Sequence, residues 1–313
     1  MNKDLISVIM SVYNEQEEWL KQSIESILNQ TYRCFEFIIV LDNPLNVSAK
    51  NLLEEYQVKD SRIKLVFNDE NIGLTKSLNK ALKLVKGDFI ARMDADDISE
   101  PKRLEIQYYF FMENSDIDFT STNGIIMDEN GVELYRTTTY GGSYSKAKSS
   151  LKYRNIFLHP SWMFRREILI KLQEYHDIPS AEDYDFLCRM SLAGYRFCII
   201  KNHLIRYRIR ANGISKTNLL KQKRVADCLK KHYIDSLDNP GAYNSLERSI
   251  EKIQVTRKEE RNYSKASELY IKGINSSKKG KKLKTLFYIT SSCLISKDKI
   301  KEIITVLNLR KVR

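Results

Sequence analysis

The first hundred residues alternate between short apolar segments and longer segments in which apolar residues recur every three or four positions. The short segments have the length of strands and the longer ones have the period of helices, at residues 5–12, 15–30, 35–41, 48–58, 63–67, 74–85 and 88–93 in turn. Strands separated by helices of this length form βαβ units, in which neighbouring strands run parallel. The chain is therefore predicted to be an α/β protein with a Rossmann-like, mostly parallel central sheet flanked by helices.

One edge of this predicted sheet is the expected place for chemistry. In open α/β sheets, ligands bind at the carboxyl ends of the parallel strands. The loops that follow Val12, Leu41, Phe67 and Met93 are therefore where functional side chains are expected.

The remainder of the chain has a mixed pattern, followed by an almost wholly helical one. Two helix-like and four strand-like segments precede residue 216, at 101–113, 181–192, 119–127, 132–139, 195–200 and 204–209. The Asn-Gly pair at 130–131 is typical of a hairpin turn. We expect a catalytic domain over 1–215, with halves at about 1–100 and 101–215, followed by a helical, basic region over 216–313.

Charge is distributed unevenly along the 313 residues. The net charge is +12, and residues 241–313 alone hold 18 Lys and Arg against 7 Asp and Glu, a balance of +11. Residues 1–240 are nearly neutral, with 34 basic and 33 acidic side chains, and the composition changes at the Asp-Asn-Pro-Gly stretch 238–241. A basic C-terminal region favours a polyanionic partner, either a membrane leaflet or nucleic acid.

The densest part of this region is the run Lys-Lys-Gly-Lys-Lys-Leu-Lys at 278–284, which apolar residues follow at irregular helical spacing. Such a segment predicts an amphipathic helix on an anionic leaflet, where each Lys near the surface contributes about 1 kcal/mol. The alternative is a solvated helical hairpin that packs on the catalytic domain. The near-neutral charge of residues 1–240 and the lack of a recognised motif argue against nucleic acid as the partner.

Three sequence features predict a cytoplasmic location. No apolar run approaches the roughly 18–20 residues of a spanning helix. The N-terminus lacks the apolar stretch and the cleavage site of a signal peptide. The five Cys form no Cys-x-x-Cys pair and leave one over, which favours reduced thiols.

Three carboxylates follow the fourth apolar segment. Asp94, Asp96 and Asp97 lie within four consecutive positions, of which the remaining one is Ala95. Negative charges this close repel one another unless a cation or water compensates. In an extended chain Asp94 and Asp96 point to the same side, and oxygen ligands of this kind suit Mg²⁺ or Mn²⁺. The alternative is that Asp96, Asp97 or Ser99 caps the helix predicted to follow.

A second acidic group begins the helix predicted at 181–192. Glu182, Asp183 and Asp185 could present a general base to a cleft. The alternative is that they only complement the helix dipole.

Other catalytic signatures are missing from the sequence. Without Gly-x-Gly or Gly-x-Ser-x-Gly, dinucleotide fingerprints, P-loops and hydrolase elbows are excluded, and the four His are scattered.

Several motifs occur in an order that resembles the family 2 glycosyltransferases, which have the nucleotide-sugar-binding GT-A fold. They are SVIMSVYNE at 7–15, QTY at 30–32, FEFIIVLD at 35–42, NIGLTKSLN at 71–79, GDFIARMDADD at 87–97, HPSWMFRR at 159–166 and EDYD at 182–185. The resemblance covers about residues 5–215. The segments around 90–97 and 159–166 look most like bacterial capsule, exopolysaccharide and O-antigen transferases of the amylovoran type.

This resemblance implies a nucleotide-sugar donor, with a UDP-sugar as the first choice. Val12, Tyr13 and Glu15 would line the pocket for the base and the ribose. Asp42, after the second strand, would meet the base, although the loop that follows it departs from the family's usual Asp-Asp-Gly-Ser. Asn71 is also expected among the donor-binding residues.

The resemblance also implies a metal site and a catalytic base. Asp96 would bind Mn²⁺ or Mg²⁺ directly, and Asp94 would face the ribose or the same cation. Lys76 would contact the diphosphate, because Leu stands at position 78 where many relatives have Arg. Asp183 would deprotonate the acceptor hydroxyl while the cation neutralises the diphosphate leaving group. In-line attack would then invert the anomeric carbon.

Arg210 stands where many relatives have a His shortly after a Tyr-Arg pair. One interpretation is that Arg210 contacts phosphate directly. The other is that Arg206, Arg208 and Arg210 form an alternating row on an exposed strand face.

The implied function is an inverting, metal-dependent transferase that moves a sugar to a hydroxyl of a glycan acceptor. The acceptor would be lipid-linked, and the enzyme would lie on the cytoplasmic face of the bacterial inner membrane. One alternative is a sugar-nucleotide nucleotidyltransferase, which normally has a Gly-rich, basic phosphate loop, whereas residues 11–15 contain neither Gly nor a cation. The other is a non-enzymatic polyanion-binding protein that uses the basic region.

Overall fold

The computed structural model describes residues 4–138, 144–210, 218–278 and 280–312. These residues divide into two compact units, the first within 1–148, 156–177 and 185–211, and the second within 149–155, 178–184 and 212–313. The domain boundary predicted at 215–216 lies outside the described residues, as does the last residue of the strand predicted at 132–139.

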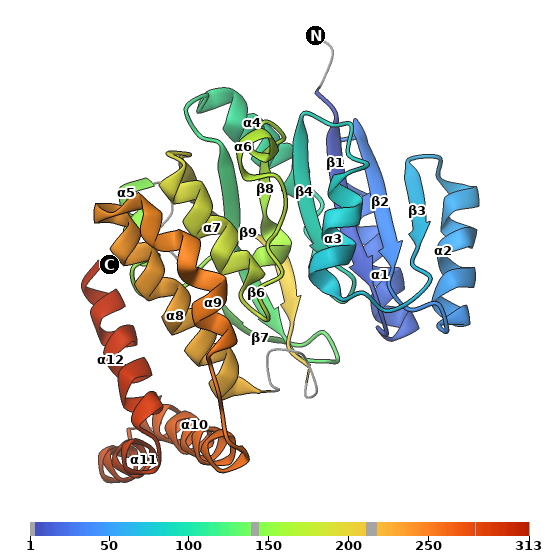
Figure 1. Cartoon of the computed structure of the whole chain (residues 1–313). Helices are drawn as coiled ribbons and strands as arrows, with labels where there is room; N and C mark the ends of the chain where they lie inside the picture. The colour runs from blue at the N-terminus through green and yellow to red at the C-terminus, as the bar shows by residue number, and fades with distance from the viewer. Residues whose placement is uncertain (1–3, 139–143, 211–217, 279, 313) are drawn as a thin grey trace. The chain divides into compact units, whose positions relative to one another are not determined.

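The first unit is built on one mixed sheet (Figure 1). In the described residues its strands lie in the order β3-β2-β1-β4-β8-β6-β9-β5, with β7 paired to β6. Their bounds are β1 (Ile6–Val12), β2 (Phe35–Leu41), β3 (Ile63–Phe67), β4 (Phe89–Asp94), β5 (Ile98–Ser99), β6 (Phe119–Met127), β7 (Glu133–Arg136), β8 (Met163–Arg165) and β9 (Phe197–Arg208). The pairs β1–β2, β2–β3, β1–β4 and β6–β9 are parallel, and β8 joins the two halves antiparallel to both β4 and β6. The predicted α/β fold with a mostly parallel sheet is confirmed.

Helices cover both faces of this sheet. Those before residue 193 are α1 (Glu17–Leu28), α2 (Val47–Lys59), α3 (Leu74–Leu82), α4 (Arg103–Glu113), α5 (Tyr144–Ser150), the 3-10 turn η1 (His159–Ser161), α6 (Ile168–Leu172) and α7 (Glu182–Leu192). Side chains alternate along a strand, so Val8 and Met10 of β1 face the core that α1, α2 and α4 complete. Helix α3 packs on β1 and β2 from the other face.

A close approach of Gly87 to the start of β1 sets β4 beside β1. A Cβ atom at Gly87 would lie 2.6 Å from both the carbonyl oxygen of Leu5 and the amide nitrogen of Ser7. The next residue, Asp88, donates its backbone N–H to Leu5 O at 2.8 Å. Only glycine fits this contact, and it aligns β4 so that Asp94 emerges next to the end of β1.

The prediction of two strands at 195–200 and 204–209 is wrong. Instead, β9 is continuous. Its register against β6 shifts between Thr122 and Asn123, so that the intervening Lys201 and Asn202 have no opposite residue. Asn123 Nδ2 donates to Lys201 O at 3.0 Å across this irregularity. The polar residues therefore mark a bulge and not the end of a strand.

The second unit is mainly helical, as predicted for the C-terminal region. It contains α8 (Leu219–Asp238), η3 (Pro240–Ser245), α9 (Leu246–Glu251), α10 (Arg257–Lys278), α11 (Lys282–Ile295) and α12 (Lys297–Val312). In the described part of the chain, no helix is long and apolar enough to cross a membrane.

Candidate active site

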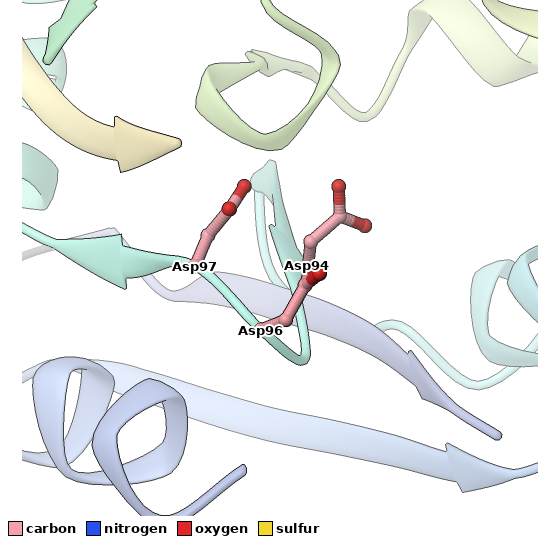
Figure 2. Close-up of side chains that lie close together, drawn as sticks. All are labelled: Asp94, Asp96 and Asp97. Carbon is pink, nitrogen blue, oxygen red and sulfur yellow. The ribbon is translucent and has the colours of Figure 1, made fainter. Parts of the chain in front are cut away.

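Three carboxylates cluster at the carboxyl end of β4. Asp94 is the last residue of this strand, and Asp96 and Asp97 lie in the turn between it and β5. Figure 2 shows the three side chains leaving one short segment of chain. Each offers an oxygen, and these oxygens all lie within 4.8 Å of one another. The local spacing thus brings together the two aspartates predicted as ligands, and Asp97 joins them.

Arginine side chains hold two of these carboxylates in place. Both terminal nitrogens of Arg92, two positions earlier in β4, contact Asp94, with Nη1 donating to Oδ2 at 2.6 Å. Arg210 Nε lies 2.8 Å from Asp96 Oδ2. The paired contact from Arg92 fixes the orientation of the Asp94 carboxylate as well as balancing its charge.

Asp97 is held by the backbone and keeps one oxygen without a partner. Its Oδ1 accepts the backbone N–H of Arg208 at 2.8 Å. Its Oδ2 is buried and has no hydrogen-bond partner in the described structure. A buried carboxylate oxygen without a partner costs free energy, which a donor or a cation at this position would recover.

The electrostatics of the cluster favour a bound cation. Burial, and next the negative charge of Asp94, raise the pKa of Asp96 to about 7 against the opposing effect of Arg210. Burial and the neighbouring Asp96 raise the pKa of Asp97 well above its ordinary value. Closely spaced oxygen ligands with one unmatched position are the donor set that Mg²⁺ and Mn²⁺ prefer. The residues present therefore fit a divalent cation.

The structure rules out the alternative that these acids cap a helix. Helix α4 begins at Arg103, and its N-cap residue Lys102 makes no side-chain cap. The backbone N–H of Leu104 instead donates to Gln30 Oε1 at 3.0 Å. Gln30 Nε2 also donates to Ser99 Oγ at 3.2 Å. A glutamine two residues after α1 thus caps α4 and leaves the aspartates available.

The interpretation of three exposed arginines in a row is also wrong. Arg208 is buried, and it donates from Nε to Asp96 O at 2.8 Å and from Nη2 to Gln22 Oε1 at 2.9 Å. Arg206 Nε bonds Glu100 Oε1 at 2.7 Å. Strand β9 therefore directs its last arginines at the turn that carries the cluster.

The residues predicted to line the base and ribose pocket lie at the end of β1. Val12 is fully buried, whereas Tyr13 is exposed. Glu15 Oε2 accepts the backbone N–H of Tyr13 at 2.8 Å, and Glu15 Oε1 lies 3.9 Å from Arg210 Nη2. Burial raises the pKa of Glu15 despite that hydrogen bond. Because Arg210 contacts both Glu15 and Asp96, the end of β1 and the carboxylate cluster form one neighbourhood.

Asp42 holds the turn that begins α3. Its buried carboxylate accepts from Asn68 Nδ2, Ile72 N and Gly73 N at 2.8, 2.9 and 2.8 Å. Gly73 has a φ of +86°, a left-handed conformation that glycine adopts readily. The contact of Asp42 with a nucleotide base stays a prediction.

Asn71 and Lys76 lie on this same turn and helix. Asn71 is exposed, and its Oδ1 accepts the N–H of Gly73 at 3.0 Å. Lys76 Nζ lies 3.6 Å from Asp177 Oδ2, and both side chains are exposed. Their roles toward a donor also stay predictions.

Asp183 belongs to the second unit and lies in the first turn of α7. Asn155 Nδ2 donates to its Oδ2 at 2.6 Å, and the N–H of Tyr184 donates to its Oδ1 at 2.6 Å. Asp185 differs, because it is fully buried in the first unit and binds Arg189 Nε at 2.7 Å and His176 Nδ1 at 3.3 Å. Of the two, Asp183 is therefore the better candidate for a base.

Sequence reasoning did not assign Arg92, Arg208 or Asp97 to the site. A signal existed for Arg92, because a residue two positions before Asp94 in a strand points to the same side. For Arg208 none existed, since it lies 111 positions from Asp97 and is brought there by the pairing of β5 with β9.

Comparison with known proteins agrees with this geometry. The sequence model described as glycosyl transferase family 2 matches residues 7–173. The uncharacterized glycosyltransferase MJ1057 of Methanocaldococcus jannaschii is 42% identical over 71% of this chain and 77% of its own. The O-antigen biosynthesis glycosyltransferase WbnJ of Escherichia coli is 34% identical over 69% of this chain and 84% of its own.

A more distant relative and a solved structure fit the same pattern. The amylovoran biosynthesis glycosyltransferase AmsE of Erwinia amylovora is 28% identical over 68% of this chain and 79% of its own. The crystal structure of S. aureus TarS 1-349 in complex with UDP-GlcNAc has a TM-score of 0.60 at 16% identity, and the match covers 93% of this chain and 92% of that fragment. That likeness confirms the predicted fold. The chain belongs to family 2 of the glycosyltransferases, as its motifs indicated.

Proposed function

We propose that this glycosyltransferase moves a sugar from a UDP-sugar to a hydroxyl group of a glycan acceptor, with inversion at the anomeric carbon. The observation that carries the proposal is the cluster of three carboxylates at the end of β4, two of them buried, in a chain of this family. Structures of the TarS fold in complex with UDP-GlcNAc and with UDP support the choice of nucleotide.

The donor site extends from the end of β1 to the turn after β4. Tyr13 and Glu15 would meet the base and ribose, and Asp42 would support the adjoining turn or meet the base itself. Asp96 and Asp94 would hold Mn²⁺ or Mg²⁺, with Asp97 Oδ2 as a further oxygen. Bound there, the cation would neutralise negative charge on the diphosphate leaving group.

Cationic side chains near this site would share that task. Arg210, at 2.8 Å from Asp96, is close enough to the cluster to reach a phosphate beside it. Lys76 is exposed at the start of α3 and would meet the diphosphate from the other side. Charge-assisted contacts of this kind stabilise the charge that develops on the leaving group.

Asp183 would act as the general base. The acceptor oxygen forms a bond to the anomeric carbon, the bond from that carbon to the phosphate oxygen breaks, and the acceptor proton passes to the Asp183 carboxylate. Asn155 and the N–H of Tyr184 would hold the carboxylate in the required orientation. One carboxylate suffices, because inversion requires no covalent intermediate.

We place the reaction in the synthesis of a bacterial surface polysaccharide, with an acceptor carried on a lipid. The names of two relatives, which refer to O-antigen and amylovoran biosynthesis, support this placement. The basic C-terminal region supports a peripheral position on the cytoplasmic face of the inner membrane.

The first test is thermal stability of the purified chain with UDP, GDP or dTDP, each with Mn²⁺ and with EDTA. A nucleotide at 100 times its dissociation constant should add about 2.7 kcal/mol of stability. We expect stabilisation by UDP that requires the metal and is lost in Asp96→Asn. Stabilisation by a different nucleotide alone would overturn the UDP assignment.

The second test separates binding from chemistry. UDP release from a panel of UDP-sugars is measured with a bacterial membrane extract as the source of acceptor. Asp183→Asn should keep the UDP-dependent stabilisation but lower turnover by about 10²–10⁴-fold, the range of positioned acid–base catalysis. The matched control is Asp116→Asn, which removes an exposed carboxylate paired with Arg196. Near wild-type turnover in Asp183→Asn would remove Asp183 from the mechanism.

A further inference from the structure

Helix α11 of the second unit has one packed face and one bare face. On the packed face, Ser292 Oγ donates to Ala266 O of α10 at 2.7 Å. The two helices also approach closely at Gly273, where a Cβ atom would lie 2.9 Å from Ile289 Cγ1. This side of α11 is thus fixed against α10, whereas among the described residues its other side is exposed.

The bare face is apolar. Leu283, Leu286, Phe287 and Leu294 are 85, 63, 64 and 88% exposed. Their spacing places them on one side of a helix with 3.6 residues per turn. Thr290, which falls on the same side, donates its hydroxyl to Leu286 O at 2.9 Å and so satisfies its own polar group. We call these four apolar residues the outer face of α11.

The charged residues that flank the outer face along the chain have a single sign. Lys281, Lys282 and Lys284 are all exposed at the start of α11. Between Glu268 and Asp298 the sequence contains seven Lys and no acidic residue. A second copy of the chain would bring the same positive charge to this face, whereas anionic lipid headgroups would neutralise it.

The length of α11 is suited to lying on a bilayer and not to crossing it. Its 14 residues extend about 21 Å, and the hydrocarbon core of a bilayer is about 30 Å thick. A short helix with exposed Leu and Phe on one side and Lys beside them binds in the plane of the interface.

We propose that α11 docks this enzyme on an anionic lipid bilayer. Leu283, Leu286, Phe287 and Leu294 would insert among the acyl chains, and the three lysines would bind headgroup phosphates. Helix α11 would thus be the element that holds the enzyme at the membrane, and the biological meaning of this docking rests on the proposed function. Docking itself requires neither the donor nor the metal.

Flotation of the full chain with vesicles tests the proposal. We expect binding to vesicles of one-third phosphatidylglycerol in phosphatidylcholine, weaker binding at high salt, and little binding to phosphatidylcholine alone. Leu286→Glu/Phe287→Glu should abolish flotation. Lys281→Gln/Lys282→Gln/Lys284→Gln should weaken the partition about 100-fold, since each Lys near the surface contributes roughly fivefold.

Matched controls carry the same changes elsewhere on the surface. Val58→Glu/Ile170→Glu alters apolar side chains that are 89 and 85% exposed. Lys50→Gln/Lys59→Gln/Lys83→Gln removes three exposed lysines of the first unit. Both controls should float like the wild type. Because the altered outer-face residues are exposed, all variants should keep the wild-type melting temperature.

Three results would overturn the proposal. The wild type does not float with anionic vesicles even at low salt, the outer-face variant floats as well as the wild type, or that variant converts a dimer to a monomer in solution. Failure of docking and failure of the proposed function are distinguishable in the same preparation. A protein that is stabilised by UDP but does not float contradicts only the docking, and one that floats without binding any nucleotide contradicts only the donor site.

Discussion

The side-chain amide of Asn79 bonds both backbone groups of Tyr175. Asn79 Nδ2 donates to the Tyr175 carbonyl oxygen at 2.8 Å, and Asn79 Oδ1 accepts the Tyr175 N–H at 2.9 Å. The Tyr175 hydroxyl in turn lies 3.2 Å from His159 Nε2. Asn79 closes the motif at 71–79, so helix α3 is fastened to a segment 96 positions away. The last residue of this motif thus has a positioning role.

Asn79→Ala should destabilise the protein by about 2–6 kcal/mol. The substitution leaves two buried backbone groups without partners, each of which costs about 1–3 kcal/mol. Urea unfolding measures the loss. Asn51→Ala, on the exposed surface of α2, is the control and should change stability by less than about 0.5 kcal/mol. An equal effect of the two substitutions would contradict the role given to Asn79.

Arg92→Lys should lower turnover by about 10–100-fold with a smaller effect on stability. A lysine cannot make the paired contact with both oxygens of Asp94, so that carboxylate would lose its fixed orientation. The measurement is turnover as a function of Mn²⁺ concentration. Arg62→Lys, which breaks a similar paired contact to Asp60 away from the cluster, should leave the curve unchanged. A normal curve for Arg92→Lys would show that Asp94 needs no fixed orientation.

Long strands of the sheet could be predicted from the sequence alone. The predicted bounds of β2, β3 and β6 agree with the structure residue for residue. Strands β2 and β6 are buried along their whole length. Strand β2 is a nearly continuous apolar run, whereas β6 has apolar residues at its two ends and small or polar ones between them. The short strands β5 and β8 could not be predicted, because two or three residues have no readable period and become strands only by pairing with β9, β4 and β6.

The candidate site also has a part that could be predicted from the sequence and a part that could not. The carboxylates of Asp94 and Asp96 could be predicted, because their grouping depends on local spacing after one strand. Their partners could not. Arg210 reaches Asp96, and Gln30 caps α4, only through the tertiary arrangement of segments far apart in the chain. The local pattern therefore brings together the two aspartates predicted as ligands but gives no sign of the residues that orient them.

Arg210→Gln should shift two affinities in opposite directions. The guanidinium of Arg210 competes with a cation for Asp96, so its removal should tighten Mn²⁺ binding by about tenfold, the value of one charge-assisted hydrogen bond. If Arg210 also contacts phosphate, UDP binding in the presence of saturating Mn²⁺ should weaken. Calorimetric titration measures both. Arg196→Gln, which removes an exposed arginine paired with Asp116, is the control. Unchanged Mn²⁺ affinity would mean that the Arg210–Asp96 pair does not compete with the metal.

Asp185→Asn should reduce stability by an amount that depends on pH. Although burial raises the pKa of Asp185, His176 and Arg189 outweigh it and hold the pKa below the ordinary value of 3.8. A group whose pKa is depressed on folding stabilises the native state above its ordinary pKa, and that stability is lost as the pH falls through the folded-state pKa. Near neutral pH, removal of the charge from this buried group should cost about 3 kcal/mol.

The difference between wild type and Asp185→Asn in urea unfolding should therefore be largest near neutral pH and should shrink as the pH falls below about 4. Between the ordinary pKa and the lower folded-state pKa, only the unfolded chain binds a proton at Asp185, so the wild type loses stability. Below the folded-state pKa the two proteins become alike at this position. Asp116→Asn, which alters an exposed carboxylate, should give a small difference throughout. A difference for Asp185→Asn that stays constant from neutral to acidic pH would mean that the contacts to Arg189 and His176 act through packing and not through charge.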